Sequence, residues 1–289
     1  MRSTKSLLLS SVFCLLFPLA LTAADNKTAH ADLTAAQIVE KNVAARGGLQ
    51  VWRGVQSMSW TGKMDAGGGS INRSRRMAQH MPGRNGKMQF AEDSDVKNGS
   101  SAKQTELPFV LEMKRPQKTR VEIQFAGKTA VQVFDGTNGW KVRPYLNRND
   151  AEPFTSEEVK EESARAALDG PLVDYAAKGT KVEFEASEPV AGHEAYKLKL
   201  TTKDGNVQHV WIDKESFLDV KIDGLPRRMD GRMRNVWIYQ RDFRSVQGVM
   251  VPFVLETAVD GFHETHKMVI DKVEVNPKLD DALFAKPKA

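Results

Sequence analysis

The feature that most constrains this chain is a strict two-residue alternation of apolar and polar side chains. In the stretch VEIQFAGKTAVQVFDGTNGW, the residues Val121, Ile123 and Phe125 alternate with polar ones, and Val131 and Val133 resume the pattern after a short turn. Successive side chains of a β-strand point to opposite faces of the sheet, so this period predicts strands with one apolar and one polar face. The fold must therefore cover a continuous apolar surface.

The same alternation recurs through most of the chain. It is present earlier in SMSWTGKM and LPFVLEMKRP, and after Lys181 in KVEFEA, AYKLKLTT, VQHVWID, FLDVKID, VWIYQRDF, VPFVLETAV and HKMVIDKVEV. Turn sequences such as Lys203-Asp204-Gly205-Asn206 separate these segments and indicate hairpins. We expect about ten or eleven strands, all connected by hairpins.

A sheet of this width has to curl. At about 4.8 Å per strand it spans roughly 50 Å, and open sheets of that width twist and close on themselves in part. The pattern therefore predicts a mainly β fold, in which a single curled antiparallel sheet forms an incomplete β-barrel covered by a few α-helices.

Three segments carry the sequence signals of helices. The first begins at a capping box formed by Thr34 and Gln37 and ends at Gly47, and a short second helix is expected over residues 49–55. The third is expected over residues 156–169. So few helices cannot cover the whole inner face of the sheet, which leaves apolar surface inside it.

The third helix is expected to be a loose cover. Thr155 and Glu158 form a second capping box, and Gly170 ends the helix. Its apolar face is poor, because Val159 and Leu168 are the only large apolar side chains in it. Such a helix can lie over a surface without being locked into it.

Residues 1–31 are predicted to be a secretory signal peptide. Arg2 and Lys5 precede an apolar run, and small residues then predict cleavage after Ala24 or Ala31. A retained membrane anchor is the alternative, but the apolar run has roughly 15 residues against the roughly 20 that a spanning helix needs. We expect an exported protein that is soluble once the signal is removed.

Cysteine content and charge exclude several classes of function. The single cysteine, Cys14, lies inside the apolar run, so the mature chain should have no disulfide, no thiolate metal site and no cysteine nucleophile. The formal net charge of +5 falls to +3 (5 − 2) when Arg2 and Lys5 are removed. This charge is too small to indicate a nucleic-acid partner.

The stretch from about 65 to 106 interrupts the strand pattern. It is rich in glycine, carries five basic side chains between Arg73 and Lys87 followed by several acidic ones, and shows little periodicity. We predict a flexible insertion between two strands. The alternative interpretation is a binding arm for an anionic surface.

The sequence shows no catalytic signature. It has no GxSxG motif, no Walker loop, no HExxH motif and no glycine-rich loop opening a helix after a strand. His263 and His266 are interpreted as exposed hairpin histidines rather than a metal pair, and His209 as a core histidine with satisfied hydrogen bonds. We expect no enzymatic activity, no metal and no cofactor.

A cluster of four arginines stands out late in the chain. Arg227, Arg228, Arg232 and Arg234 flank a Met-Asp-Gly turn in the stretch PRRMDGRMR. A solvated hairpin is the favoured interpretation, and a contact with an acidic partner is the alternative.

Large apolar side chains on the predicted strands are the candidates for a cavity wall. Aromatic residues inside a curled sheet with few helices to pack them are compatible with a pocket for lipid chains, although an ordinary core would bury them too. The candidate cavity residues are Trp60, Phe109, Leu111, Met113, Val121, Ile123, Phe125, Val131, Val133, Trp140, Trp211 and Trp237.

Several long segments resemble one family. The strings AAQIVEKNVAARGGLQVWRGVQSMSWTGKM and LPFVLEMKRPQKTRVEIQFAGKTAVQVFDGTNGWKVRPYL are similar to the outer-membrane lipoprotein-sorting proteins, the LolA-like group. The segments LDGPLVDYAAKGTKVE and VNPKLDDALFAKP strengthen the resemblance, which covers most of the chain after the signal peptide. We therefore expect residues 32–289 to form a LolA-like lipid-binding half-barrel.

The resemblance implies an incomplete antiparallel β-barrel with a helical lid and an apolar cavity for acyl chains. LolA itself carries lipoproteins across the periplasm, from an inner-membrane ABC transporter to an outer-membrane receptor, and relatives of the same fold include a periplasmic regulator of envelope stress. The insertion at 65–106 departs from the compact family pattern, and no position here matches the arginine that latches the lid of LolA.

These expectations define two hypotheses of function. The first is a monomeric periplasmic carrier that binds lipid or lipoprotein acyl chains, with an inner-membrane transporter and an outer-membrane acceptor as partners and no nucleic acid. The alternative is a lipid-sensing periplasmic regulator of the same fold that transports nothing. The sequence names neither the cargo nor the partners.

Overall fold

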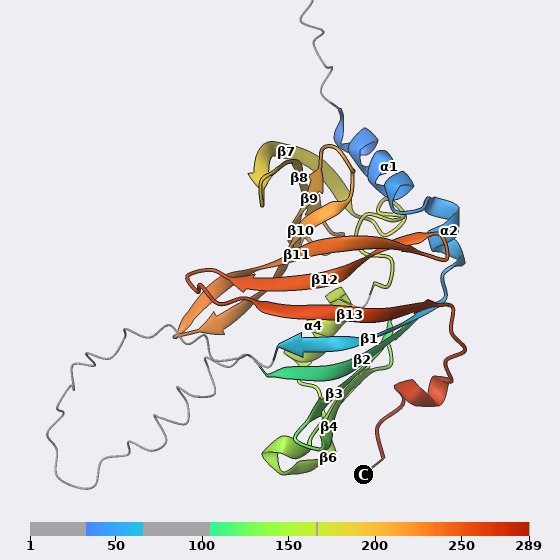
Figure 1. Cartoon of the computed structure of the whole chain (residues 1–289), viewed down its shortest axis with the longest axis vertical. Coiled ribbons are helices and arrows are strands. Elements are labelled where there is room, and N and C mark those ends of the chain that lie inside the picture. The colour runs from blue at the N-terminus through green and yellow to red at the C-terminus, as the bar shows by residue number, and fades with distance from the viewer. Residues whose placement is uncertain (1–32, 66–104, 166, 289) are drawn as a thin grey trace, which may run out of the picture. The chain divides into compact units, whose positions relative to one another are not determined.

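A computed structural model describes residues 33–65, 105–165 and 167–288 (Figure 1). The predicted signal peptide at 1–31 lies outside these residues, as does nearly all of the insertion predicted at about 65–106. All of the elements below belong to the unit that starts at Leu33.

The helices form where their capping signals predict. Helix α1 spans Ala35–Ala45, with Thr34 and Gln37 forming the predicted capping box, and α2 spans Leu49–Gly54. Helix α4 spans Ser156–Arg165, and the Thr155 hydroxyl accepts a hydrogen bond from the backbone N–H of Glu158. Two short 3₁₀ helices, η1 at Pro144–Leu146 and η2 at Asp281–Phe284, complete the helical elements of the described residues.

Among the residues that the structure describes, thirteen strands follow the alternating segments and join one sheet. Their bounds are β1 Ser57–Asp65, β2 Glu106–Lys114, β3 Lys118–Phe125, β4 Lys128–Phe134, β5 Gly139–Arg143, β6 Arg148–Pro153, β7 Lys181–Val190, β8 His193–Thr201, β9 Val207–Asp213, β10 Asp219–Met229, β11 Arg232–Val246, β12 Val249–Val259 and β13 His266–Val275.

The sheet is antiparallel and open. Its order is β6-β5-β4-β3-β2-β1-β13-β12-β11-β10-β9-β8-β7, so β1 and β13 pair near the middle, while β6 and β7 form the two edges. In Figure 1 the outer strands run at a steep angle to β12, β13 and β1, which shows the twist of the sheet. The prediction of a mainly β fold with a single, incompletely closed antiparallel sheet is confirmed.

Two details of the prediction are wrong. The strand count is 13 rather than ten or eleven, and one of the extra strands is β6, whose sequence RNDAEP has no apolar alternation. An edge strand with little burial does not need that alternation. The connection from β6 to β7 is also not a hairpin, because it runs from one edge of the sheet to the other and contains α4.

The chain leaves the third helix earlier than predicted. Helix α4 ends at Arg165, whereas the sequence predicted a helix to residue 169. Leu168 and Asp169 are buried outside the helix, in the turns that lead to β7. Their burial against the rest of the fold takes precedence over local helix propensity.

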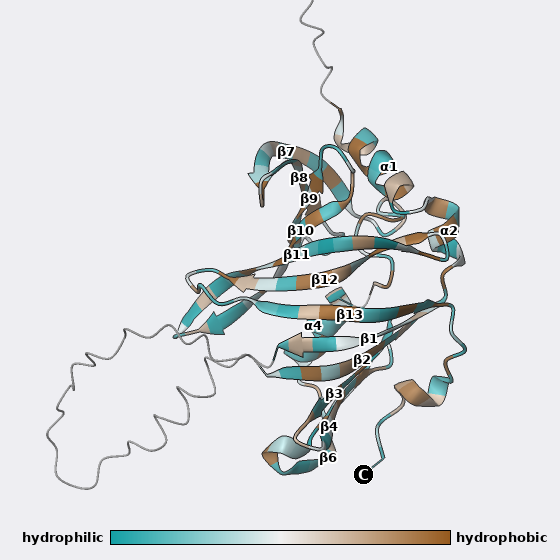
Figure 2. Cartoon of the chain, viewed as in Figure 1, coloured by the Kyte–Doolittle hydropathy of each residue, from teal (hydrophilic) through white to brown (hydrophobic). Residues whose placement is uncertain are grey.

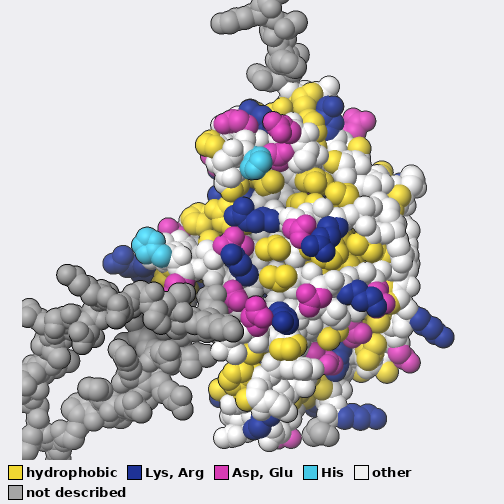
Figure 3. All heavy atoms as spheres, in the orientation of Figure 1, with side chains coloured by type: hydrophobic (Ala, Val, Ile, Leu, Met, Phe, Trp, Pro, Cys, Tyr) yellow, Lys and Arg dark blue, Asp and Glu magenta, His cyan; other side chains and the backbone are white. Residues whose placement is uncertain are grey.

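Strand pairing defines two faces of the sheet. On one face, side chains of β8 and β9 pack with Ile38 and Val39 of α1, and side chains of β12 and β13 pack with Trp52 of α2. We call this the helix-covered face and the other the opposite face. Figure 2 shows the alternation of hydrophilic and hydrophobic residues along the strands, and Figure 3 shows acidic and basic side chains mixed with apolar ones in the same view.

Within residues 33–65, 105–165 and 167–288, no helix has the length and apolar character needed to cross a membrane.

Candidate functional site

The register of β1, β2 and β3 places seven of the predicted cavity residues on the helix-covered face. Trp60, Leu111 and Val121 lie directly opposite one another on the three strands. Residues directly opposite in antiparallel strands share a face, and so do residues two apart in one strand. The seven residues, which we call the β1–β3 wall, are Trp60, Phe109, Leu111, Met113, Val121, Ile123 and Phe125.

The β1–β3 wall is only partly covered. Phe109 is 2% exposed, whereas the other six residues of the wall are only partly buried. Helix α4 contributes no fully buried side chain. An open hollow of about 660 Å³ lies where β2 begins and β3 turns into β4, with Leu107 and Phe125 in its lining. The wall is therefore apolar surface that the protein's own side chains do not seal.

Polar contacts hold α4 over the same face. The Thr119 hydroxyl donates to Glu162 Oε1 at 2.7 Å, and Lys141 forms an ion pair with Glu158. Thr119 lies directly opposite Met113, and Gln132 lies directly opposite both Val121 and Lys141. Thr119 and Lys141 therefore belong to the helix-covered face. Helix α4 thus rests on a hydrogen bond and an ion pair rather than on buried apolar side chains.

The ion pair also sets the protonation of Glu158. Burial by itself raises the pKa of this carboxyl group. The hydrogen bonds from Lys141 and from the Thr155 backbone N–H, together with the attraction of the Lys141 charge, outweigh burial and hold the pKa of Glu158 below its ordinary value. The ionised carboxylate is therefore the form that fixes the start of α4.

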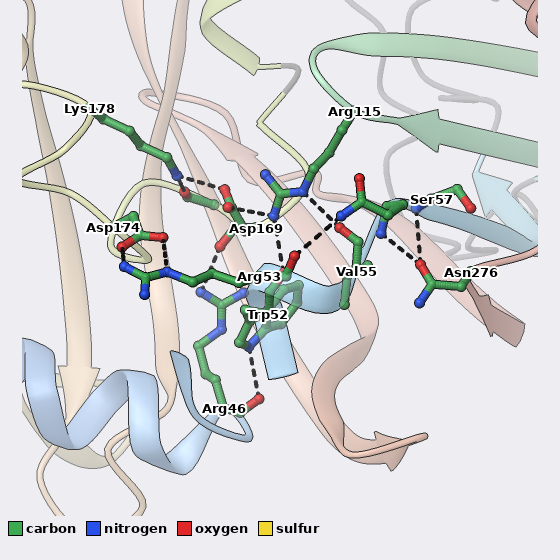
Figure 4. Close-up of polar contacts among 12 residues, drawn as sticks. Arg46, Trp52, Arg53, Val55, Ser57, Arg115, Asp169, Asp174, Lys178 and Asn276 are labelled. Carbon is green, nitrogen blue, oxygen red and sulfur yellow. Dashed lines mark hydrogen bonds and ion pairs between the residues drawn. The ribbon is translucent and has the colours of Figure 1, made fainter. Parts of the chain in front are cut away.

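The segment after α4 is anchored more firmly, through Asp169 (Figure 4). Arg115 Nη2 donates to Asp169 Oδ2 at 2.8 Å, and Lys178 Nζ donates to Asp169 Oδ1 at 2.6 Å. Arg53 forms two hydrogen bonds with Asp174, of 3.0 and 2.7 Å. Because the Asp169 side chain is only 5% exposed, its charge depends on these partners.

Arg46, at the C-cap of α1, is a functional candidate that sequence reasoning missed. Its guanidinium lies 4.5 Å from the Trp52 ring centroid, donates to the Asp169 carbonyl oxygen at 3.1 Å, and is 3.7 Å from Asp219 Oδ2. Asn42 donates to the other oxygen of the Asp219 carboxylate at 2.8 Å. The structure thus places Arg46 against the segment that follows α4.

Three of the predicted cavity residues, Val131, Val133 and Trp140, lie on the opposite face of the sheet from the β1–β3 wall. Val133 pairs with Arg120 and Trp140, and Val131 pairs with Glu122. The C-terminal segment lies over this region, since Arg120 Nη1 donates to the Leu283 carbonyl at 3.0 Å. Val133 is buried on this face, and Val131 and Trp140 are partly buried.

Trp211 and Trp237 also lie on the opposite face of the sheet. The Lys221 ammonium lies 4.1 Å from the Trp211 ring and 4.9 Å from the Trp237 ring, and 5.8 Å from that of Tyr239. Burial lowers the pKa of Lys221 below its ordinary value. The lysine stem covers the aromatic surface, so this cluster is closed by the chain itself.

The histidines take structural positions. His209 Nδ1 is 2.6 Å from Asp223 Oδ2 and His209 Nε2 is 3.3 Å from Glu185 Oε2, so its hydrogen bonds are satisfied as predicted, although it lies on the opposite face and not in a core. His263 is exposed in the turn between β12 and β13, as predicted, and His266 begins β13 half-buried. No cluster of His, Cys, Asp and Glu among the described residues has the arrangement of a metal site.

One polar group in the β1–β3 wall lacks a partner. The indole N–H of Trp60 is buried and forms no hydrogen bond with the described residues. A buried unpaired donor costs free energy, and an oxygen atom of a bound molecule would relieve that cost.

Solved structures from bacteria share this fold. A LolA superfamily protein from Nitrosomonas europaea aligns with a TM-score of 0.51 at 15% identity, over 88% of this chain and 99% of its own. A DUF1329 family protein from Desulfovibrio piger aligns with a TM-score of 0.51 at 14% identity, over 88% of this chain and 98% of its own. No protein-family model and no curated protein sequence matches this chain.

At these identities the likeness concerns the fold alone. The structure and the likeness agree with the resemblance seen in the sequence, namely an open antiparallel sheet with helices on one face. The chain thus has a LolA-like fold.

Proposed function

We propose that this protein is a periplasmic carrier that binds acyl chains of lipids or lipoproteins against the β1–β3 wall and moves them toward the outer membrane. The observation that carries the proposal is that six apolar residues of this wall stay partly exposed beneath a helix that buries no side chain of its own. Soluble proteins rarely leave apolar surface uncovered without a binding role for it.

The physical need for such a carrier is large. A saturated chain of about 15 methylenes costs on the order of 12 kcal/mol to expose to water, at about 0.8 kcal/mol each. A cargo with several chains therefore cannot cross an aqueous compartment unshielded. The β1–β3 wall supplies apolar contact, and the Trp60 N–H supplies one donor for an ester or carboxyl oxygen of the cargo.

The cover over the wall suits loading and release. Helix α4 is held by Thr119–Glu162 and Lys141–Glu158, which are contacts that water can replace. The segment after it is held at Asp169, whose carboxylate accepts hydrogen bonds from Arg115 and Lys178 and whose carbonyl oxygen accepts one from Arg46. We infer a lid that lifts at α4 while its other end stays attached.

The remaining parts of the proposal rest on the sequence. Residues 1–31 direct export and are cleaved after Ala24 or Ala31, and the mature protein works in the periplasm as a monomer. An inner-membrane transporter loads it and an outer-membrane acceptor unloads it. It binds no nucleic acid and catalyses no reaction.

Native mass spectrometry of the protein purified from the periplasm of its own cells tests the proposal. We expect a complex whose extra mass equals that of a lipid or acylated peptide and which organic extraction removes. Protein that carries no lipid in this experiment would contradict acyl-chain binding. N-terminal sequencing of the same sample should give Asp25 or Asp32, and a mature chain that starts at Met1 would contradict export.

A second measurement separates the carrier from a sensor. The lipid-loaded protein is mixed with acceptor vesicles, and transfer of the lipid is followed with time. A carrier should release its lipid to the vesicles, whereas retention of the lipid would favour a sensing role for the same wall.

A further inference from the structure

The tip of the β10–β11 hairpin carries four arginines whose placement the lipid-binding wall does not explain. A tight turn at Asp230-Gly231 joins the two strands, and both of its residues have positive φ. The register places Arg227 directly opposite Arg234, and Arg228 opposite Met233. Like charges directly opposite one another in a sheet are destabilising. The hairpin therefore keeps a charge arrangement that opposes its own stability.

None of these four arginines forms an ion pair with a residue that the structure describes. Every other arginine in the described ranges forms one; these are Arg46, Arg53, Arg115, Arg120, Arg143, Arg148, Arg165, Arg241 and Arg244. The same chain thus pairs its arginines elsewhere and leaves these four without a described carboxylate partner.

An exposed apolar side chain accompanies the charge. Met233 is 58% exposed, the highest value among the exposed large apolar residues of the described chain. It lies on the same face of the hairpin as Arg228, because the two residues are register partners. A flexible apolar side chain among cations suits the interface between lipid headgroups and acyl chains.

The hairpin lies at a functional end of the sheet. The strands from β10 to β2 in the sheet order are all antiparallel to their neighbours. The hairpin between β10 and β11 therefore lies at the same end of the strands as the last residues of β1 and the first residues of β2. The open hollow with Leu107 and Phe125 in its lining lies at this end as well. The network around Asp169 contacts the start of β1 and so lies at the opposite end.

We propose that the tip of the β10–β11 hairpin docks this protein onto the surface of a membrane that contains anionic phospholipids. The charge complements the phosphate of anionic headgroups, and the exposed Met233 enters the interfacial layer beside them. An acidic protein surface would leave the role of Met233 unexplained. Docking would bring the hollow near the bilayer, but it does not depend on lipid binding by the β1–β3 wall.

Co-sedimentation with vesicles tests this inference. The purified full chain is mixed with vesicles of phosphatidylcholine alone and with vesicles that also contain phosphatidylglycerol, at low and at physiological salt. We expect binding to the anionic vesicles only, weakened by salt, as electrostatic docking requires. A wild-type protein that binds neither vesicle would overturn the proposal and leave an acidic protein as the partner.

Two matched variants locate the contact. The test variant carries Arg227→Gln, Arg228→Gln, Arg232→Gln and Arg234→Gln, and the control carries Lys160→Gln, Lys203→Gln, Lys278→Gln and Lys286→Gln, which are exposed residues without a described ion pair. Both lose the same charge. At about fivefold for each basic residue near the membrane, the test variant should bind about a hundredfold or more weakly, whereas the control should stay near wild type.

All variants contain the same N-terminal segment and the same insertion. Any vesicle binding by these two segments is therefore equal in the variants and does not affect their comparison. Melting curves establish that each variant is folded. Equal losses in the test and control variants would show a general charge effect and overturn the assignment to the hairpin. Met233→Ser should weaken binding a few-fold at physiological salt, and an unchanged affinity would remove the apolar part of the proposal.

Discussion

Two regions of the helix-covered face have the same strand pattern and different cover. Under α1, Leu198, Leu200, Val210 and Ile212 are almost completely buried. In the β1–β3 wall only Phe109 reaches that degree of burial. Strand alternation therefore shows which side chains are turned toward the helices, but the covering helix decides whether they become core or accessible surface.

The two helices explain the difference. Helix α1 packs Ile38 and Val39, which are fully or almost fully buried, against the side chains of β8 and β9. Helix α4 has the sequence SEEVKEESAR and rests on polar contacts of Glu158 and Glu162. A helix that is polar almost all round does not complete a core. The β1–β3 wall is thus left partly exposed.

The largest difference in stability between the region under α1 and the β1–β3 wall should appear when a charged side chain is introduced into each. Ile212→Asp places a carboxylate in a site with no exposure, which costs about 4–5 kcal/mol or more. That is a large share of the ~5–15 kcal/mol of a typical domain, so the variant should not fold stably. Ile123→Asp should fold, because water can reach the wall, and should lose the binding of a fluorescent fatty acid.

Melting curves measure the folding of both variants, and displacement of the fluorescent probe measures their lipid binding. Two unfolded variants would mean that the β1–β3 wall is ordinary core. A folded Ile123→Asp variant that binds the probe like wild type would mean that the lipid lies elsewhere.

Truncating a leucine to alanine should also destabilise the region under α1 more than the β1–β3 wall, by a smaller amount than a buried charge does. Leu198→Ala removes a side chain of 0% exposure and should lower the free energy of unfolding by about 2–5 kcal/mol. Leu111→Ala should lower it by about 1 kcal/mol, because its side chain is already partly exposed. Urea unfolding of the two variants measures both values, and equal losses would remove the distinction between the regions.

The sequence predicted most of the fold because alternation is a local signal. It found the strands, the capping boxes of α1 and α4, and the weakness of α4 as a cover. It missed β6, whose residues are polar, and the early end of α4, where Leu168 and Asp169 leave the helix for contacts far along the chain. Those contacts depend on tertiary packing.

The candidate site was predicted less well because faces depend on register. The turn at Ala126-Gly127 pairs Phe125 with Lys128, which places Val121 opposite Gln132 and so turns Val133 to the other face. Counting back from the turn would have excluded Val131 and Val133 from the wall. Arg46 offered no local signal, because its partner Asp169 is 123 residues away.

A smaller effect should appear when α4 is released by acid. The folded-state pKa of Glu158 lies below its ordinary value, so the Lys141–Glu158 contact stabilises the folded state above that ordinary value. Its contribution is lost as the pH falls through the lower folded-state pKa. Hydrogen exchange of residues 156–165, corrected for intrinsic rates, should quicken over this acidic range.

Lys141→Met serves as the control for that experiment. It removes the ion pair at every pH, so α4 should exchange rapidly already at neutral pH and change little with acid. An α4 that is equally protected in Lys141→Met and in wild type would show that the ion pair does not hold the lid.

The smallest expected effect concerns Trp60. Trp60→Phe keeps an aromatic ring in the wall and removes the unpaired N–H, so the free energy of unfolding should change by less than about 1 kcal/mol. The affinity for a fatty-acid ester should fall about fivefold, as expected for one lost hydrogen bond of about 1 kcal/mol. The affinity for a hydrocarbon probe without oxygen should not change, and an equal loss for both probes would assign Trp60 a purely apolar role.

Photocrosslinking can show where an acyl chain binds. A fatty acid with a diazirine in its chain is bound to the protein, activated by light, and located by peptide mass spectrometry. We expect labelled peptides from β1, β2 and β3, around Leu111 and Ile123, and none from β8 or β9 under α1. Labels concentrated in β8 and β9, or on the opposite face around Trp211 and Trp237, would contradict this expectation.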